Sequence, residues 1–325
     1  MILAIDVGGT KMAAGLVAPD GAVITSRRAA TPQNADAETL WHILTTLIDP
    51  LSARAEGVGV GCGGPMTWPD GEVSPLNIPG WRGFPLRARL AGRFPGLPVR
   101  LHNDAICLAV AEHWQGAGQG SADMLGMVVS TGVGGGLILG GRLVNGGTGN
   151  AGHIGHVVVE PDGGPRCGCG GHGCLEAIAR GPALTTWALT QGWTPAAVSE
   201  PVEASEGPEA YLEDRAVTGR ALAADALAGD PMAVLAMRRA GRALGIAIAS
   251  ATHLCDLDLV TIGGGLSQAG EPLFGPLEEA LRDHARMGFA RRLKVVPAAL
   301  GQEAGLVGAA ALLLAGDAYW PSTRD

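Results

Sequence analysis

The chain has no run of lysine and arginine, no acidic tail and no apolar segment long enough to cross a bilayer. Its formal net charge of -8 is not concentrated anywhere, so it offers no electrostatic footprint for nucleic acid or an anionic membrane. The first residues, MILAIDVGG, lack the basic region and the cleavage site of a secretion signal. We therefore expect a globular, cytoplasmic protein with neither nucleic acid nor membrane as a partner.

Cysteine is scarce, and half of it lies in one short window. Of six cysteines, Cys167, Cys169 and Cys174 fall within the stretch CGCGGHGC. In a chain without a secretion signal, such clustering favours a metal over disulfides. Three thiolates and one histidine would complete a tetrahedral Cys₃His zinc site, which is closed and therefore structural.

Glycine, by contrast, is abundant, with 52 residues gathered in a few places. In LAIDVGGTKMAAGLV, residues 3–5 and 12–17 read as two strands joined by a turn at Gly8 and Gly9. The same design recurs in MVVSTGVGGGLILGG, where the turn is Thr131–Gly136. Two such hairpins, each opening a run of alternating strands and helices, predict two related α/β lobes with a cleft between them.

The two hairpins are candidates for a nucleotide site. Backbone N–H groups freed at a glycine turn form an anion-binding concavity, so both turns could face the phosphates of one nucleotide. Asp6, at the end of the first strand, would hold a hydrated Mg²⁺ ion. The alternative is a pair of ordinary β-turns, which the paired arrangement disfavours. Neither turn is a Walker A loop, since no Gly-Lys-Ser/Thr closes it. Neither fits the dinucleotide fingerprint, because each returns into a strand.

A second candidate lies between the hairpins, in LPVRLHNDAICLAVAEHW. Residues 99–102 read as a strand and residues 105–114 as a helix, with Asn103 and Asp104 at the junction. Asp104 could be the helix cap. It could also be a catalytic base that accepts a proton from a substrate hydroxyl while that oxygen attacks a γ-phosphorus. The two roles are compatible, because capping fixes the carboxylate.

Six motifs in this order, DVGGTK, HNDAICLAVAEHW, STGVGGG, AGHIGH, CGCGGHGCLEA and IGGGLS, resemble the ROK family of bacterial sugar kinases and sugar-responsive repressors. The resemblance runs over residues 2–314 and implies an α/β, two-lobed, actin-like ATPase fold of the ribonuclease H-like, hexokinase type. ATP would lie in the central cleft, beside a structural zinc loop. A homodimer or homotetramer is expected.

The resemblance also implies domain limits. The N-terminal lobe would span residues 1–118 and be completed by a C-terminal helix at about 303–318. The second lobe would span residues 119–302 and carry the zinc loop, residues 153–176. The polar residues 193–214 read as a surface loop.

Further residues gain roles from the resemblance. Asp104 matches the catalytic aspartate of the family, and His156 would be the fourth zinc ligand, with His172 as its rival. The expected nucleotide-binding residues are Asp6, Gly8, Gly9, Thr10 and Lys11 in the first phosphate motif, Thr131, Gly132, Gly134 and Gly135 in the second, and Gly264 and Gly265 near the adenosine. The expected sugar-binding residues are Gly64, Asn77, Asn103, Asp104, His153, His156 and Glu176.

His153 departs from the family pattern, because many members read AGEIGH where this chain reads AGHIGH. A carboxylate can accept from two sugar hydroxyls, whereas a neutral imidazole offers one donor and one acceptor. A donor suits an N-acetyl carbonyl, and within the family the stretch is most similar to bacterial N-acetylmannosamine kinases. The alternative is a glucokinase in which a water replaces the direct contact.

The sequence therefore predicts an ATP-dependent kinase of the 6-hydroxyl of a hexose or N-acetylhexosamine, with N-acetylmannosamine favoured and glucose as the alternative. The expected cofactors are ATP, Mg²⁺ and structural Zn²⁺. A sugar-sensing regulator is disfavoured, because the phosphate hairpin starts at residue 6 and leaves no room for a helix-turn-helix. A zinc-ribbon interaction protein would leave the paired hairpins and Asn103–Asp104 unexplained.

Overall fold

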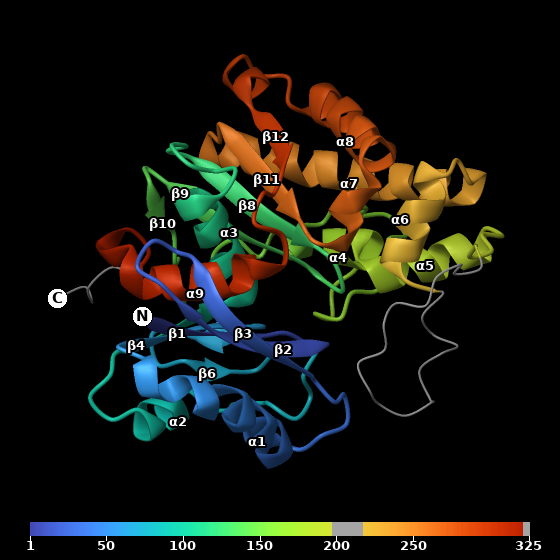
Figure 1. Cartoon of the computed structure of the whole chain (residues 1–325). Helices are drawn as coiled ribbons and strands as arrows, with labels where there is room; N and C mark the ends of the chain where they lie inside the picture. Colours follow the sequence, from blue (N-terminus) through green and yellow to red (C-terminus); the bar gives the residue numbers. More distant parts are fainter. Residues whose placement is uncertain (197–216, 321–325) are drawn as a thin grey trace.

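Two five-stranded sheets form the framework of the computed structural model, which describes residues 1–196 and 217–320 (Figure 1). The first sheet has the order β3 (Val23–Ala30), β2 (Lys11–Val17), β1 (Ile2–Val7), β4 (Gly57–Cys62) and β7 (Val99–Asn103). The second has the order β10 (Arg142–Leu143), β9 (Val133–Leu139), β8 (Met124–Val129), β11 (Leu259–Gly263) and β12 (Lys294–Pro297).

Each sheet is built around one glycine hairpin. β1 pairs antiparallel with β2 and parallel with β4, while β8 pairs antiparallel with β9 and parallel with β11. The shared pattern confirms the prediction of two related α/β halves. In the first hairpin the strands are longer than the predicted residues 3–5 and 12–17, because the backbone pairing continues toward the glycines.

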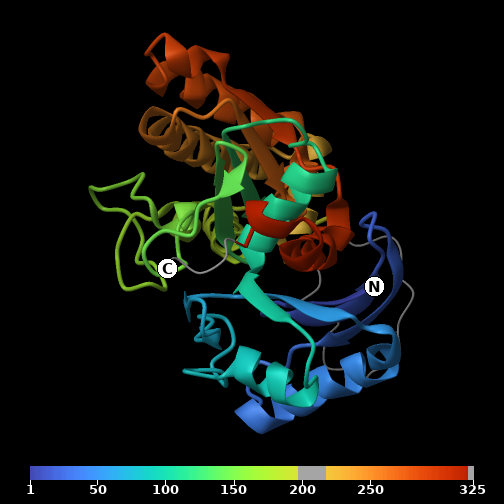
Figure 2. The ribbon, with the colours of Figure 1, turned by 90° about the vertical axis from the view of Figure 1, so that its left-hand side faces the viewer.

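Two helices lie between the sheets, α3 (Asp104–Gln115) and α9 (Ala304–Leu314), as Figures 1 and 2 show. α9 packs on β1 and β4, and α3 packs on β8, β9 and α9. Their approach is very close, since a Cβ at Gly308 would overlap the carbonyl oxygen of Cys107. The chain therefore crosses between the halves at both helices. The expected lobe boundary near residue 118 stays a prediction.

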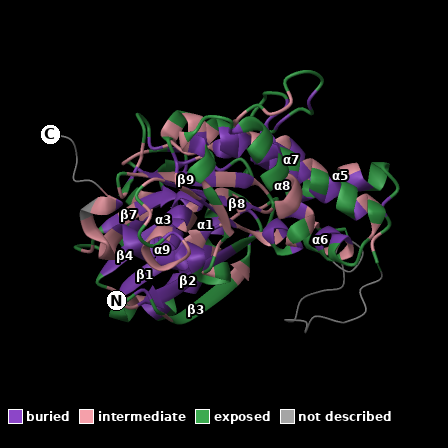
Figure 3. Ribbon diagram, turned by 90° about the horizontal axis from the view of Figure 1, so that it is seen from above, coloured by how far each residue is buried: buried purple, intermediate pink, exposed green. Residues whose placement is uncertain are grey.

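Alternation along β1 explains this layering. Leu3 and Ile5 are buried in one apolar cluster with α1 (Ala37–Ile48), while Ile2 and Ala4 are buried in another with α9. Because both faces of the strand are covered, it reads as a continuous apolar run. The buried residues in Figure 3 accordingly lie along β1, α3 and α9.

The remaining helices cover the outer faces. α2 (Leu86–Arg93) joins α1 on the first half, next to a short hairpin of β5 (Met66–Thr67) and β6 (Glu72–Val73). The second half carries α4 (Leu175–Ala179), α5 (Gly181–Thr190), α6 (Gly219–Leu227), α7 (Pro231–Cys255) and α8 (Glu271–His284). Within the described chain, none of the helices is both long and apolar enough to span a bilayer.

The predicted surface loop over residues 193–214 falls mostly on residues 197–216, which lie outside the described residues. Its described start is anchored. Trp193 is buried, and its indole N–H donates to Asp225 Oδ2 at 2.9 Å.

Candidate active site and metal cluster

The turn between β1 and β2 is held by side chains that use its carbonyl groups. Thr31 Oγ1 donates to the carbonyl of Gly8 at 2.8 Å, and Gln33 Nε2 donates to that of Gly9. Because these contacts fix the carbonyl side, the turn keeps one orientation, as an anion-binding concavity requires. Neither Thr31 nor Gln33 was expected from the sequence.

Asp6 lies beside this turn, and its carboxylate packs against the first turn of α9. A Cβ at Gly305 would overlap Asp6 Oδ2, so only glycine fits there. Burial, and then the charge of Asp104, raises the pKa of Asp6 to about 7. The charges of Lys11 and Arg28 act in the opposite direction. Asp6 is thus a buried carboxylate close enough to Asp104 to be affected by its charge, and carboxylate oxygens are ligands that suit a divalent cation.

Asp104 is the first residue of α3, but the cap of that helix is Asn103. Asn103 Oδ1 accepts from the N–H of Ala105 at 3.0 Å. The expectation that Asp104 itself caps the helix is therefore wrong, although Asp104 Oδ1 also accepts from that N–H, at 2.8 Å. Burial raises the pKa of Asp104, which strengthens it as a base.

Five of the seven predicted sugar-binding residues, Gly64, Asn77, Asn103, Asp104 and His153, meet at the turn that follows β4. A Cβ at Gly64 would lie 2.8 Å from Asn103 Nδ2 and 3.5 Å from His153 Nε2. A Cβ at the preceding Gly63 would lie 3.2 Å from Asn77 Oδ1 and 3.9 Å from Asp104 Oδ2. The structure thus brings together residues from β4, β7 and the second half of the molecule.

Asn77 also reaches the first phosphate turn. A Cβ at Gly9 would lie 2.5 Å from Asn77 Nδ2, so this amide lies against both Gly9 and Gly63. Gly63 was missed from the sequence, although it stands in the motif GCGGP beside the predicted Gly64.

His153 has a defined donor and acceptor. Its Nδ1 lies 2.9 Å from the carbonyl oxygen of Asn150, which can only accept, so Nδ1 carries the proton of the neutral ring. Burial lowers the pKa of His153, which favours that neutral form. Nε2, the atom that faces Gly64, is therefore an acceptor. The expectation that His153 offers a donor to a substrate carbonyl is wrong, because Asn150 already uses the donor.

The second phosphate turn, Thr131–Gly136, is bound to α4 by Glu176. The N–H of Val133 donates to Glu176 Oε2 at 2.9 Å, and a Cβ at Gly132 would lie 2.9 Å from the same oxygen. The third glycine turn lies nearby, because a Cβ at Gly264 would overlap the carbonyl of Val129, the last residue of β8. The predicted groups Thr131–Gly135 and Gly264–Gly265 are thus neighbours.

The predicted zinc ligands form one cluster. The ligand atoms of His156, Cys167, Cys169 and Cys174 all lie within 4.8 Å of one another. Cys169 Sγ and Cys174 Sγ are 3.8 Å apart, and Cys167 Sγ is 3.6 Å from His156 Nδ1. A tetrahedral site with zinc–sulfur bonds of about 2.3 Å has edges of about 3.8 Å, so the four side chains fit a zinc ion.

His172, the rival ligand, is exposed and is not part of the cluster found among the described residues. The cysteines of the cluster are free thiols and not disulfides.

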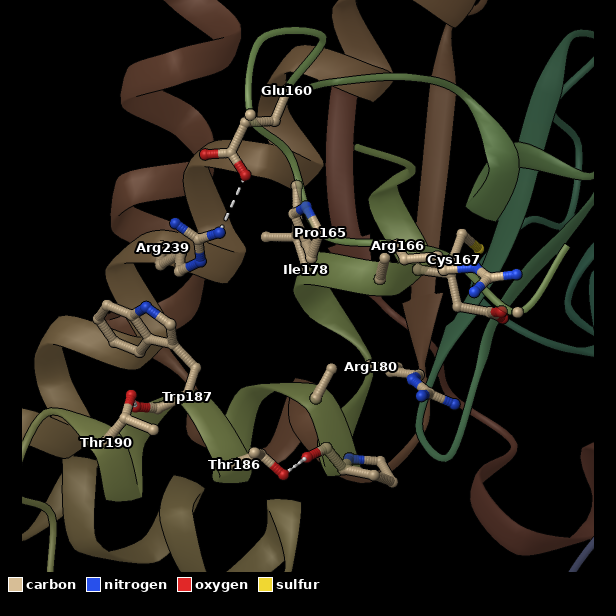
Figure 4. Close-up of a pocket in the computed structure, with 16 residues that line it drawn as sticks. Glu160, Pro165, Arg166, Cys167, Ile178, Arg180, Thr186, Trp187, Thr190 and Arg239 are labelled. Carbon is tan, nitrogen blue, oxygen red and sulfur yellow. Dashed lines mark hydrogen bonds and ion pairs between the residues drawn. The ribbon is translucent and has the colours of Figure 1, made fainter. Parts of the chain in front are cut away.

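A cavity of about 700 Å³ lies next to the expected zinc loop, residues 153–176 (Figure 4). Cys167 and Glu176 line it, together with Arg239 of α7, which forms an ion pair with Glu160 at 2.9 Å and stacks over Trp187 at 5.4 Å. Neither Asp6 nor Asp104 lines this cavity. The cavity therefore lies away from these two carboxylates. The ion pair between Glu160 and Arg239 connects the expected zinc loop, residues 153–176, to α7.

The fold and the site together define a class of protein, the sugar kinases with a two-lobed, actin-like fold. Residues 2–315 match the model of the ROK family. The chain belongs to the ROK family and is a ROK sugar kinase.

Two of its relatives have different activities in their names. The chain is 35% identical over 316 residues to a glucokinase of Thermotoga maritima, with 96% of each chain covered. It is 36% identical over 314 residues to an N-acetylmannosamine kinase of Shigella flexneri, with 96% of this chain and 97% of the relative covered.

Among solved structures, a ROK family glucokinase from Streptomyces griseus, in complex with glucose and AMPPNP, superposes with a TM-score of 0.80. It is 34% identical, and the match covers 97% of this chain and 99% of the other. These likenesses confirm the predicted family and fold.

Proposed function

We propose that this protein transfers the γ-phosphoryl group of ATP to the 6-hydroxyl of an N-acetylhexosamine or hexose, with N-acetylmannosamine as the favoured substrate and glucose as the second candidate. The observation that carries the proposal is the position of Asp104. Its carboxylate lies between the turn at Gly63–Gly64, where Asn103 and His153 converge, and Asp6 beside the first phosphate turn.

The mechanism follows from these positions. Asp104 accepts the proton of the 6-hydroxyl while that oxygen attacks the γ-phosphorus, and the raised pKa of Asp104 makes it a better base than an exposed aspartate. Both glycine turns hold the phosphates through backbone N–H groups. Asp6 would hold Mg²⁺, which when bound neutralises charge on the phosphates.

The metal cluster has a separate role in this proposal. Zinc held by His156 and the three cysteines would fix the loop that precedes α4. α4 carries Glu176, which accepts from Val133 in the second phosphate turn. A metal bound there would thus stabilise the site without touching the reacting atoms. Homodimeric or homotetrameric assembly stays a prediction that light scattering can test.

His153 supports N-acetylmannosamine for a reason different from the one expected. Its Nε2 accepts a single hydrogen bond, whereas the glutamate common in the family can accept two. One acceptor suits the single N–H of an acetamido group. A glucose hydroxyl can also donate to it, and relatives with both names are similarly close to this chain.

A coupled assay of ADP release tests the proposal across N-acetylmannosamine, glucose, N-acetylglucosamine and mannose, with MgATP and, separately, polyphosphate as donor. We expect the highest kcat/KM for N-acetylmannosamine with ATP, and a kcat lower by about 10²- to 10⁴-fold for the Asp104→Asn variant. A preference for glucose would make the protein a glucokinase. Phosphorylation of no sugar would refute the proposed function.

A further inference from the structure

His102 is a buried histidine whose ring joins the two halves of the molecule. It has no exposed surface, and it directly precedes Asn103 and Asp104 at the end of β7. Its Nδ1 lies 2.9 Å from the backbone nitrogen of Asn103, and its Nε2 lies 2.8 Å from Asn145 Oδ1. Asn145 follows β10 in the second sheet.

The roles of both ring nitrogens can be deduced. The backbone N–H of Asn103 can only donate, so Nδ1 of His102 must accept. The proton of the neutral ring is therefore on Nε2, which donates to Asn145 Oδ1. Burial lowers the pKa of His102 to about 4, so the ring is neutral at ordinary pH. The geometry admits one tautomer and one orientation of the Asn145 amide.

The segment of residues 145–150, here called the joint loop, makes further contacts with the first half. Asn150 Nδ2 donates to the carbonyl of Met66 at 3.0 Å, and the N–H of Met66 lies 3.4 Å from Asn150 Oδ1. A Cβ at Gly149 would overlap Trp68, whose ring stacks on His102 with centroids 6.4 Å apart. The joint loop is thus bound to β5, to the segment after β5, and to β7.

The other side of the joint loop supports the sugar site. The carbonyl of Asn150 accepts from His153 Nδ1 at 2.9 Å, and the carbonyl of Asn145 accepts from the N–H of Ala151 at 3.2 Å. One continuous chain of hydrogen bonds therefore runs from the backbone of Asn103, through His102 and the joint loop, to His153. It connects the residues on the two sides of the predicted sugar pocket.

We infer that His102 and Asn145 are positioning residues, which hold Asn103–Asp104 of one half at a fixed distance from His153 of the other. Neither is among the residues that we propose to contact the sugar. A misplacement of about 1 Å can cost about a hundredfold in rate, so a hydrogen bond that fixes the two walls of the pocket bears directly on turnover. The inference rests on the proposed role of Asp104 and His153.

The test compares Asn145→Ala with Asn145→Asp in the full-length, metal-loaded protein. Alanine removes the acceptor for His102, whereas aspartate keeps an oxygen at the same place. We expect Asn145→Ala to lower kcat about tenfold and to raise KM for the sugar about tenfold, with KM for ATP unchanged. Asn145→Asp should keep kcat and the KM for the sugar close to their wild-type values. Asn34→Ala, the same change at an exposed asparagine, is the matched control.

His102→Phe gives an independent check, since it keeps a ring but loses both hydrogen bonds. Combined with Asn145→Ala, it should cost no more than the larger single effect, because both changes break one chain. Wild-type constants for Asn145→Ala, or equal changes in KM for sugar and ATP that follow thermal stability alone, would overturn the inference. If the wild type phosphorylates no sugar, the proposed function fails instead.

Discussion

The two glycine hairpins have the same backbone design but obtain their carboxylates from different places. In the first, Asp6 stands on β1 itself, two residues before the turn at Gly8. In the second, β8 ends in Val129, and the turn instead binds Glu176 of α4 through the N–H of Val133. The carboxylate at the first predicted phosphate turn therefore comes from the hairpin itself, while the carboxylate at the second comes from a separate segment.

That segment directly follows the candidate metal cluster. Cys174 is the residue that precedes α4, and Glu176 is the second residue of the helix. A bound metal would fix the start of α4 and with it the carboxylate at the second turn. The comparison teaches that one backbone motif can be local in one half and dependent on a distant metal loop in the other.

The largest effect should come from Asp104, the proposed base. Asp104→Asn should lower kcat by about 10²- to 10⁴-fold, because it removes the proton acceptor. Thermal stability should not fall, since burial already disfavours the charged carboxylate, as its raised pKa indicates. Steady-state kinetics and calorimetry measure both. A variant with near wild-type turnover would exclude Asp104 as the base.

Loss of the metal should show how far stability and activity depend on the cysteine cluster of the second half. Cys174→Ser should abolish metal binding, lower the melting temperature by several degrees and reduce activity in parallel, because metal binding and folding of the loop are coupled. Cys255→Ser, at a cysteine outside the cluster, is the control. Metal content by mass spectrometry checks the ligands. Loss of metal in His172→Ala but not in His156→Ala would show that the fourth ligand is the other histidine.

Asp6 should make the stability of the protein depend on pH. Its pKa is raised from 3.8 to about 7, so between these values the native state holds a proton that the unfolded state has lost. The free energy of unfolding should therefore fall as pH rises from about 4 to about 7, by up to about 1.4 kcal/mol per pH unit.

Urea unfolding of the zinc-loaded protein without Mg²⁺, from pH 5 to 8, measures this slope in the wild type and in Asp6→Asn. The variant should lose that part of the slope. Mg²⁺ should bind more tightly as pH rises toward 7, because it competes with the proton on Asp6. Equal slopes in both proteins would mean that Asp6 is ionised throughout.

The smallest expected effect concerns the sugar. His153→Glu replaces one acceptor by a carboxylate that can accept twice, so the ratio of kcat/KM for N-acetylmannosamine to that for glucose should fall about tenfold. His153→Gln, a neutral side chain of similar reach, is the control. An unchanged ratio in His153→Glu would show that this position does not select the sugar.

Much of the site could be predicted because its residues belong to short motifs. The strands around Gly8–Gly9 and Thr131–Gly136, the junction at Asn103–Asp104 and the cysteine cluster are each encoded by neighbouring residues. The donor assigned to His153 could not be predicted correctly. Its tautomer depends on the carbonyl of Asn150, and no sequence pattern states which backbone group a side chain will meet.

Other contributors were missed for the same reason. Gly305 lies far along the chain from Asp6, and only the packing of α9 on β1 brings them together. Thr31 and Gln33 stand in a polar stretch with no motif, yet they fix the first turn. The bond from His102 to Asn145 likewise joins two segments that belong to different sheets.

By itself the sequence determined the two hairpins and the cluster of three cysteines, because glycine turns, apolar alternation and cysteine spacing are local properties of the chain. The family and the choice of His156 as the fourth expected ligand came from the resemblance. Tertiary structure alone decided that Asn103 and not Asp104 caps α3, that Nε2 of His153 is an acceptor, and that His102 connects the two halves. These features depend on which donors and acceptors meet after the sheets pack on α3 and α9. The pairing of these donors and acceptors is fixed by the whole fold and not by any one segment.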